Sequence, residues 1–169
     1  MTTTKSTFVL FGILLISAWV LGSAIEARAE TMNYKIYTWV INRQDTPIGD
    51  VEGHKVLHDN RGAFCVFENG EVATFSNHVA TVDMVKGSGT IMQYVKLNFP
   101  DGSTIIIKSQ GTLGLPATKW DSEIIKGTGR FEGIKGTQSA NAKYLPVEKG
   151  EAGAKGYGEG TITYTLPSK

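Results

Sequence analysis

The three histidines, His54, His58 and His78, are the residues of this chain best suited to bind a metal ion. His54 and His58 are four positions apart, a spacing that brings two imidazoles together on a helix. The surrounding residues predict a strand, on which the same two side chains share a face but lie about 13 Å apart. We therefore expect no metal site, and we place His54 and His58 on the surface or at a rim.

Nucleophilic and acid–base chemistry has few candidates in the sequence. The chain has no Gly-x-Ser-x-Gly motif, and its one cysteine, Cys65, lies in the apolar run 63–67, which favours a small buried side chain over a reactive thiol. Asp83, Glu123 and Glu159 lie in predicted strands, where isolated carboxylates usually face solvent. These residues identify no catalytic group and no cofactor, and they leave open whether the protein is an enzyme.

Three polar residues occupy strand positions that are expected to face inward: Gln93, Gln138 and Tyr164. Gln93, for example, alternates with the apolar residues of the run 89–99 and therefore shares their face of the strand. We predict that these three residues line a ligand-binding site in a mostly apolar interior. The alternative is that they hydrogen-bond to one another or to a trapped water molecule.

Short apolar or alternating runs, separated by turn residues, predict an all-β fold. Eight strands are expected, over residues 32–43, 51–67, 72–86, 89–99, 104–112, 120–127, 134–144 and 156–166. A bulge or bend is expected near residues 60–62, and a bulge near 79–81 would let Val79 and Val82 share a face. The number and spacing of the strands predict a closed antiparallel eight-stranded β-barrel, with the loops 114–119 and 144–153 at its open end.

Residues 1–29 have the features of a secretory signal peptide. Lys5 provides the positive charge, residues 8–21 form an apolar run, and Ala27-Arg28-Ala29 matches the small-x-small cleavage rule. The apolar run is shorter than the roughly 20 residues of a membrane-spanning helix. We therefore predict a signal helix cleaved after Ala29, no stable membrane anchor, a secreted or periplasmic protein, and a single β-barrel domain over residues 30–169.

The charge balance argues against two classes of partner. The whole chain has a formal net charge of +1, and removal of residues 1–29 leaves equal numbers of basic and acidic side chains. A neutral chain is a poor match for nucleic acid or for an anionic lipid surface. We therefore expect neither nucleic acid nor a membrane as a partner.

The most distinctive segment spans residues 127–136 and reads Gly-Thr-Gly-Arg-Phe-Glu-Gly-Ile-Lys-Gly. A Gly-x-Gly pattern can bind phosphate, but this requires a helix after it, and residues 137–142 alternate like a strand. Glycines in strands usually mark bulges, tight corners or close approaches of the backbone, which help a small sheet to close.

The spacing of Gly127, Gly129, Phe131, Gly133 and Gly136 resembles the Gly-x-Gly-x-Phe-x-Gly-x-x-Gly segment of the allene oxide cyclase and dirigent families. The resemblance implies an eight-stranded, calycin-like barrel with this segment between its sixth and seventh strands. The secretory signal departs from the plant cyclases and fits an exported bacterial branch. Because the resemblance includes none of the cyclase's catalytic pocket, it implies the fold and not the reaction.

Three functions fit these observations. The first is an exported barrel that binds a small apolar or amphipathic molecule, because an eight-stranded barrel is just wide enough to hold one. The second is a cyclase- or isomerase-like enzyme, which would need mainly confinement of a reactive substrate and one or two polar groups. The third is a filled barrel that acts as a structural protein or a homo-oligomer through outward-facing Met92, Tyr94 and Tyr157.

Overall fold

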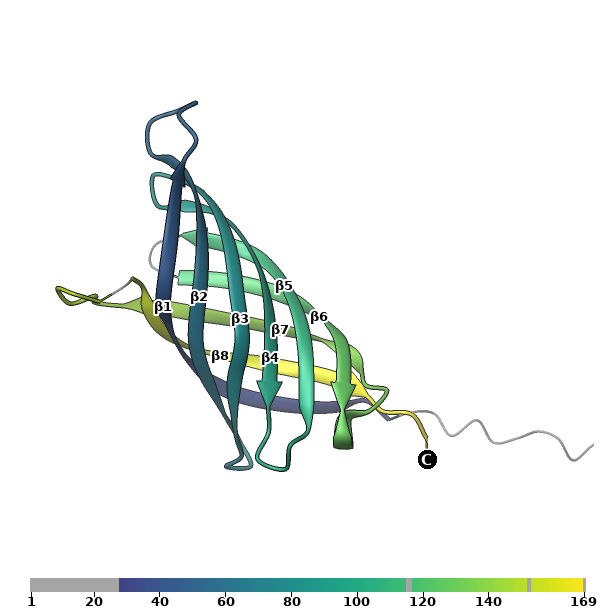
Figure 1. Cartoon of the computed structure of the whole chain (residues 1–169). Coiled ribbons are helices and arrows are strands. Elements are labelled where there is room, and N and C mark those ends of the chain that lie inside the picture. Colours follow the sequence, from purple (N-terminus) through teal and green to yellow (C-terminus); the bar gives the residue numbers. More distant parts are fainter. Residues whose placement is uncertain (1–27, 115–116, 152, 169) are drawn as a thin grey trace, which may run out of the picture.

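Each strand pairs with its neighbours in sequence and the last pairs with the first, so that eight antiparallel strands close into a barrel (Figure 1). The computed structural model describes residues 28–114, 117–151 and 153–168. Its elements are β1 (Glu30–Pro47), β2 (His54–Phe67), β3 (Val72–Val85), β4 (Ser88–Asn98), β5 (Thr104–Gly114), β6 (Ala117–Thr128), the 3₁₀ helix η1 (Gly129–Phe131), β7 (Lys135–Leu145) and β8 (Lys155–Thr165). The predicted closed all-β barrel is confirmed, whereas the predicted signal helix lies outside the described residues.

The strand boundaries differ from the predicted ones mainly at two places. β1 continues to Pro47, because its second half still pairs with the beginning of β2. The predicted loop over residues 114–119 is wrong at both ends, since β5 reaches Gly114 and β6 begins at Ala117, and these two residues pair with each other. In both places the pairing of neighbouring strands extends through residues that local turn preference had assigned to loops.

Three strands contain an extra residue that changes which face the later side chains occupy. The extra residues are Ile41 in β1, Asn77 in β3 and Ile125 in β6. The bulge predicted near residues 60–62 corresponds to a break in the pairing of β2 with β3 between Arg61 and Phe64, but the extra residue belongs to β3. The second predicted position, 79–81, is wrong: the bulge lies earlier, and Val79 therefore faces solvent.

The barrel has two different ends (Figure 1). One end, called the mouth here, is formed by the hairpins β1–β2, β3–β4, β5–β6 and β7–β8. The other end, called the base, is formed by the connections β2–β3, β4–β5 and β6–β7, and the C-terminus lies beside it. Within the described residues, no helix is long and apolar enough to cross a membrane.

Two apolar clusters fill much of the interior. The larger cluster includes five aromatic rings toward the base, with neighbouring ring centroids 4.8 to 6.1 Å apart: Tyr34, Phe67, Phe99, Phe131 and Tyr164. The smaller cluster lies toward the mouth and consists of Leu57, Ala80, Val82 and Ile91. Cys65 is buried in the larger cluster, as predicted, and burial raises the pKa of its thiol, which keeps it unreactive.

The glycine-rich segment forms the corner between β6 and β7. Gly129 and Gly133 have φ angles of +65° and +75°, which other residues rarely adopt. A Cβ atom at Gly127 or Gly136 would overlap a backbone carbonyl oxygen. The corner places the ring of Phe131 in the aromatic cluster, and a strand rather than a helix follows it. The prediction that these glycines mark corners and close approaches is confirmed.

Candidate functional site

A bulge in β3 turns His78 into the barrel. Asn77 is the extra residue that shifts the pairing of β3 with both neighbours, and its φ of +50° is one that asparagine tolerates. Because the alternation changes there, the inward positions run from Ala73 and Phe75 to His78 and Ala80. His78 is consequently only 5% exposed, although it is titratable.

The imidazole of His78 donates one hydrogen bond and keeps one unused acceptor. Nε2 lies 3.0 Å from Oε1 of Gln93, an atom that can only accept, so Nε2 carries the proton. Burial lowers the pKa of His78 to about 4, and the charge of Arg61 acts in the same direction, so the ring is neutral at pH 7. Nδ1 is therefore an acceptor, and it is buried with no hydrogen-bond partner among the described residues.

Arg61 stands directly opposite His78 in the pairing of β2 with β3. Its Nε donates to the buried carboxylate of Asp59 at 3.2 Å. Arg43 donates to the same carboxylate through Nε and Nη2, at 2.7 and 2.9 Å, and this hydrogen bonding raises the pKa of Arg43. The carboxylate of Asp59 thus pairs with two guanidinium groups, and the cluster of Arg43, Asp59 and Arg61 has one excess positive charge.

A row of polar side chains crosses the interior from β4 to β7. Its members are successive pairing partners on four strands: Gln93, Ser109, Ser122 and Gln138. The hydroxyl of Ser122 lies 2.8 Å from that of Ser109 and hydrogen-bonds to Oε1 of Gln138. Nε2 of Gln138 donates to the hydroxyl of Tyr34 on β1. Gln138 therefore finds partners within the barrel, which is the alternative that the sequence left open.

A cavity lies between this polar row and the mouth. Its volume is about 30 Å³, enough for one or two water molecules. Its apolar walls include Ile36, Phe75, Ile91, Val95, Ile107 and Trp120. Its polar lining includes Thr38, Arg61, His78, Gln93, Ser109 and Gln138. Tyr144, Ala154 and Lys155 also line it, which places it at the β7–β8 side of the mouth.

Two buried polar atoms of the cavity lining lack a hydrogen-bond partner in the described part of the chain, Nδ1 of His78 and Oγ1 of Thr38. Buried polar atoms are almost always hydrogen-bonded in folded proteins. Both residues line the same small cavity, so a polar group that enters it is the candidate partner for these two atoms.

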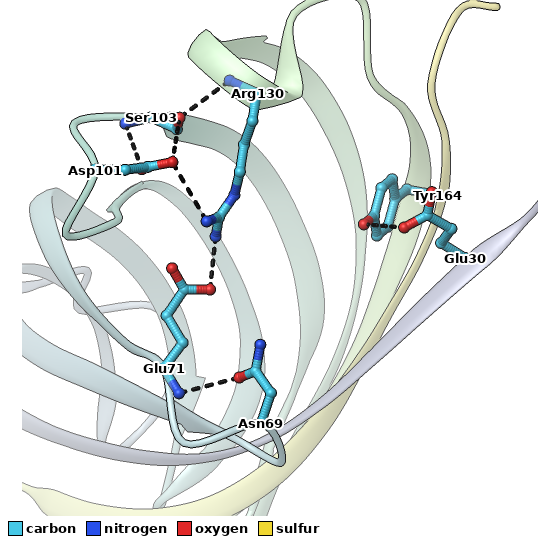
Figure 2. Close-up of polar contacts among 7 residues, drawn as sticks. All are labelled: Glu30, Asn69, Glu71, Asp101, Ser103, Arg130 and Tyr164. Carbon is cyan, nitrogen blue, oxygen red and sulfur yellow. Dashed lines mark hydrogen bonds and ion pairs between the residues drawn. The ribbon is translucent and has the colours of Figure 1, made fainter.

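Gln93 and Gln138 line the same cavity, whereas Tyr164 does not. The hydroxyl of Tyr164 donates to Oε2 of Glu30 at 2.7 Å, at the base of the barrel (Figure 2). Burial and this contact raise the pKa of Tyr164 to about 12. The structure therefore brings two of the three predicted site residues together, and their role in ligand binding stays a prediction.

Arg130 closes the base (Figure 2). Its guanidinium donates to Glu71 at 2.6 Å and lies 3.3 Å from the carboxylate of Asp101. The same group lies over the rings of Phe99 and Phe131, 4.8 and 4.7 Å from their centroids. Because these contacts and the aromatic cluster fill the base, a ligand would reach the cavity through the mouth.

The other candidate residues lie at the rim or on the outer surface. His54 sits at the mouth between Asp50 and Asp83, with N–O distances of 2.5 and 2.8 Å, and His58 is exposed, as predicted. The carboxylates predicted to face solvent do so: Asp83, Glu123 and Glu159. Across the residues that the structure describes, no group of three or more His, Cys, Asp and Glu side chains could hold a metal ion.

The sequence interpretation considered His78 only as a possible metal ligand, without placing it inside the barrel, and it did not identify Arg61. The parity conflict within residues 72–86 indicated a bulge, and placing it at Asn77, which tolerates a positive φ, would have turned His78 inward. Arg61 has the same parity along β2 as the buried Leu57 and Cys65, but arginine at such a position is normally expected to reach solvent.

No family model and no curated protein matches the chain. Similar solved structures place its fold among the dirigent-like eight-stranded barrels. The pterocarpan synthase dirigent protein GePTS1 has a TM-score of 0.50 and 15% identity, over 83% of this chain and 92% of that chain. The pterocarpan synthase dirigent protein PsPTS1 has a TM-score of 0.52 and 17% identity, over 84% of this chain and 97% of that chain.

A bacterial structure is similar to the same extent. It is a protein of unknown function from Shewanella oneidensis MR-1, of the DUF3224 family, with a TM-score of 0.51 and 13% identity over 84% of this chain and 100% of that chain. At these identities the likeness shows the fold alone. The dirigent resemblance is thus confirmed as a fold, while the allene oxide cyclase resemblance and an enzymatic reaction stay predictions.

Proposed function

We propose that this protein is an exported barrel that holds a small amphipathic molecule in the cavity at its mouth. The observation that carries the proposal is that His78 and Thr38, which line a cavity with mostly apolar walls, each have a buried polar atom without a hydrogen-bond partner among the described residues, Nδ1 and Oγ1. Ligand sites commonly combine apolar walls with a few polar groups that orient the ligand. Gln93 supports the arrangement by fixing the tautomer of His78.

The size of the cavity defines how a ligand would bind. A volume of about 30 Å³ accepts the polar end of a ligand but not its apolar body. The body would therefore lie toward the mouth and displace side chains there, of which Tyr144 and Lys155 are the best placed. The strands themselves, which pair continuously around the barrel, do not need to separate.

Tryptophan fluorescence tests this proposal, because Trp120 lines the cavity and Trp39 lies on the outer surface. An amphipathic probe such as 8-anilinonaphthalene-1-sulfonate is expected to quench the emission of the purified protein. The quenching should persist in Trp39→Phe and disappear in Trp120→Phe. Mass spectrometry of organic extracts of the purified protein should in addition show a bound small molecule. The mass of the intact protein should show cleavage after Ala29. A protein that binds no apolar probe and carries no extractable molecule would refute the proposal.

A filled barrel that associates through its outer surface is the second candidate, and the small cavity together with an exposed aromatic patch favours it. Tyr37 on β1 pairs with Tyr157 on β8 and stacks on Phe64 of β2 at a centroid distance of 5.0 Å. Met92 and Tyr94, which the sequence grouped with Tyr157, lie on β4, four strands away around the barrel. The candidate surface is therefore the patch on β8, β1 and β2.

Light scattering after size-exclusion chromatography tests this second candidate. An oligomer is expected for the wild-type protein if the patch is an interface, and Tyr37→Ser should shift it toward the monomer. Tyr94→Ser is the matched control, because Tyr94 is exposed to a similar extent on the opposite side of the barrel. A strictly monomeric wild-type protein would remove this candidate.

A further inference from the structure

Arg61 and His78 present two unlike polar groups to the same cavity. They are direct pairing partners on β2 and β3, and both line the cavity. Arg61 uses Nε for its hydrogen bond to Asp59, so the two Nη atoms, which have no hydrogen bond to any described residue, form a free donor pair. His78 offers the opposite character, a neutral acceptor at Nδ1.

The charge around Arg61 favours an anion. Arg43 and Arg61 share the single buried carboxylate of Asp59, so the cluster has one positive charge without a counterion among its own members. Lys143 and Lys155 add positive charge at the rim of the cavity, where Lys155 is paired with Glu151. A partly buried positive charge of this kind is stabilised by an anion of matching geometry.

A water molecule alone meets only half of these requirements. Water fits the cavity, but it leaves the excess charge of Arg61 uncompensated. A carboxylate matches the planar Nη pair of Arg61 through two parallel hydrogen bonds. A carboxylate by itself, however, cannot donate to Nδ1, whereas a hydroxyl group on the same ligand can.

We propose that Arg61 and His78 together recognise the polar end of a hydroxylated organic acid, with Arg61 donating to its carboxylate and Nδ1 of His78 accepting from its hydroxyl. This assignment rests on the proposed function, because it names the class of ligand for the same cavity. The apolar part of the acid then lies toward the mouth, beside Tyr144 and Lys155, because the cavity itself has room only for the polar end. Oγ1 of Thr38 supplies a further hydrogen bond.

Three matched probes test the assignment by calorimetry on the purified protein: 2-hydroxy-3-phenylpropanoate, 3-phenylpropanoate and the neutral 3-phenylpropanamide. We expect the acid to bind roughly tenfold or more tightly than the amide, the effect typical of a charge-assisted hydrogen bond. We expect the hydroxy acid to bind roughly fivefold more tightly than the acid. Each preference is assigned to one residue by repeating the titrations on variants.

The preference for acid over amide should disappear in Arg61→Gln, and the preference for the hydroxyl should disappear in His78→Phe. Arg61→Lys, which keeps the charge and loses the planar fork, should retain only part of the first preference. Arg130→Gln is the matched arginine control: it lies at the base, and both preferences should be unchanged. Circular dichroism establishes that each variant is folded.

The outcomes separate this inference from the proposed function. If the wild-type protein binds the acid and the amide equally, or if Arg61→Gln keeps the preference, the assignment is overturned while apolar binding at the mouth still stands. If no probe binds and 8-anilinonaphthalene-1-sulfonate also fails to bind, both proposals are overturned. If Arg61→Gln fails to fold, the assignment is tested by the preference of the wild-type protein for the acid over the amide and by its partial loss in Arg61→Lys.

Discussion

The guanidinium of Arg130 donates to the carboxylate of Glu71, 59 positions away in the sequence, at a distance of 2.6 Å. Glu71 belongs to the turn between β2 and β3, and Arg130 belongs to η1 between β6 and β7. Asp101, in the turn between β4 and β5, lies 3.3 Å from the same guanidinium (Figure 2). One cation therefore joins all three connections that form the base of the barrel.

Replacement of Arg130 by alanine should destabilise the barrel moderately. The side chain is 41% exposed, so its ion pairs contribute little, and most of the loss comes from its packing over the rings of Phe99 and Phe131. We expect the free energy of unfolding in urea to fall by about 1 to 2 kcal/mol. Arg130→Lys keeps the charge without the planar stacking, so its free energy of unfolding should lie between those of the wild-type protein and Arg130→Ala. An unchanged urea midpoint for Arg130→Ala would contradict this role.

The faces of the strands could be predicted from the sequence, but positions along the barrel could not. Alternation is a local pattern, and it correctly placed Gln93, Gln138 and Tyr164 on the inward face. Which side chains meet depends on the stagger of strands around a closed barrel. Gln138 meets Tyr34, 104 positions away, and Tyr164 meets Glu30, 134 positions away. A local sequence pattern carries no information about contacts over such separations. It therefore could not show that Gln93 and Gln138 line the cavity while Tyr164 lies at the base.

The pairing of β7 with β8 should depend on a glycine that leaves no room for a side chain. A Cβ atom at Gly158 would overlap the carbonyl oxygen of Asn141 on β7. We expect Gly158→Ala to lower the free energy of unfolding by about 2 to 3 kcal/mol. Gly114→Ala is the control, since the nearest atom there is Oγ of Ser88 at 3.8 Å, and its effect should stay within about 0.5 kcal/mol. Equal effects of the two substitutions in thermal unfolding would show that space at Gly158 is not limiting.

Removing one partner of the hydrogen bond between Gln138 and Tyr34 should cost stability mainly because the other partner is left buried and unpaired. Tyr34→Phe leaves Nε2 of Gln138 buried without an acceptor, which we expect to reduce the free energy of unfolding by about 1 to 3 kcal/mol. Adding Gln138→Leu removes that orphaned donor, so the double variant should be more stable than the sum of the single effects by about 1 kcal/mol. Tyr37→Phe, on the outer face of the same strand, should have little effect. Strict additivity in chemical denaturation would argue against the hydrogen bond.

The buried His78 should make the barrel lose stability in mild acid. Its pKa is about 4 in the folded protein, because burial disfavours the charged ring, against 6.5 for an unperturbed histidine. Above pH 6.5 the ring is neutral in both states; between pH 6.5 and 4 the unfolded chain binds a proton that the folded chain does not, so stability falls as the pH falls. This contribution amounts to about 3 kcal/mol over the whole window.

His78→Gln removes the titrating group and keeps a donor for Oε1 of Gln93, so its free energy of unfolding should depend less on pH between 6.5 and 4 than that of the wild-type protein. His54→Gln is the control with the opposite sign. The hydrogen bonds to Asp83 and Asp50 raise the pKa of His54, so its stabilisation is complete below pH 6.5 and is lost as the pH rises through the raised pKa. Denaturant titrations at pH 4.5, 7 and 9 separate the two residues. If His78→Gln shows the same acid sensitivity as the wild-type protein, His78 is not held neutral inside the barrel, and its Nδ1 is not a free acceptor.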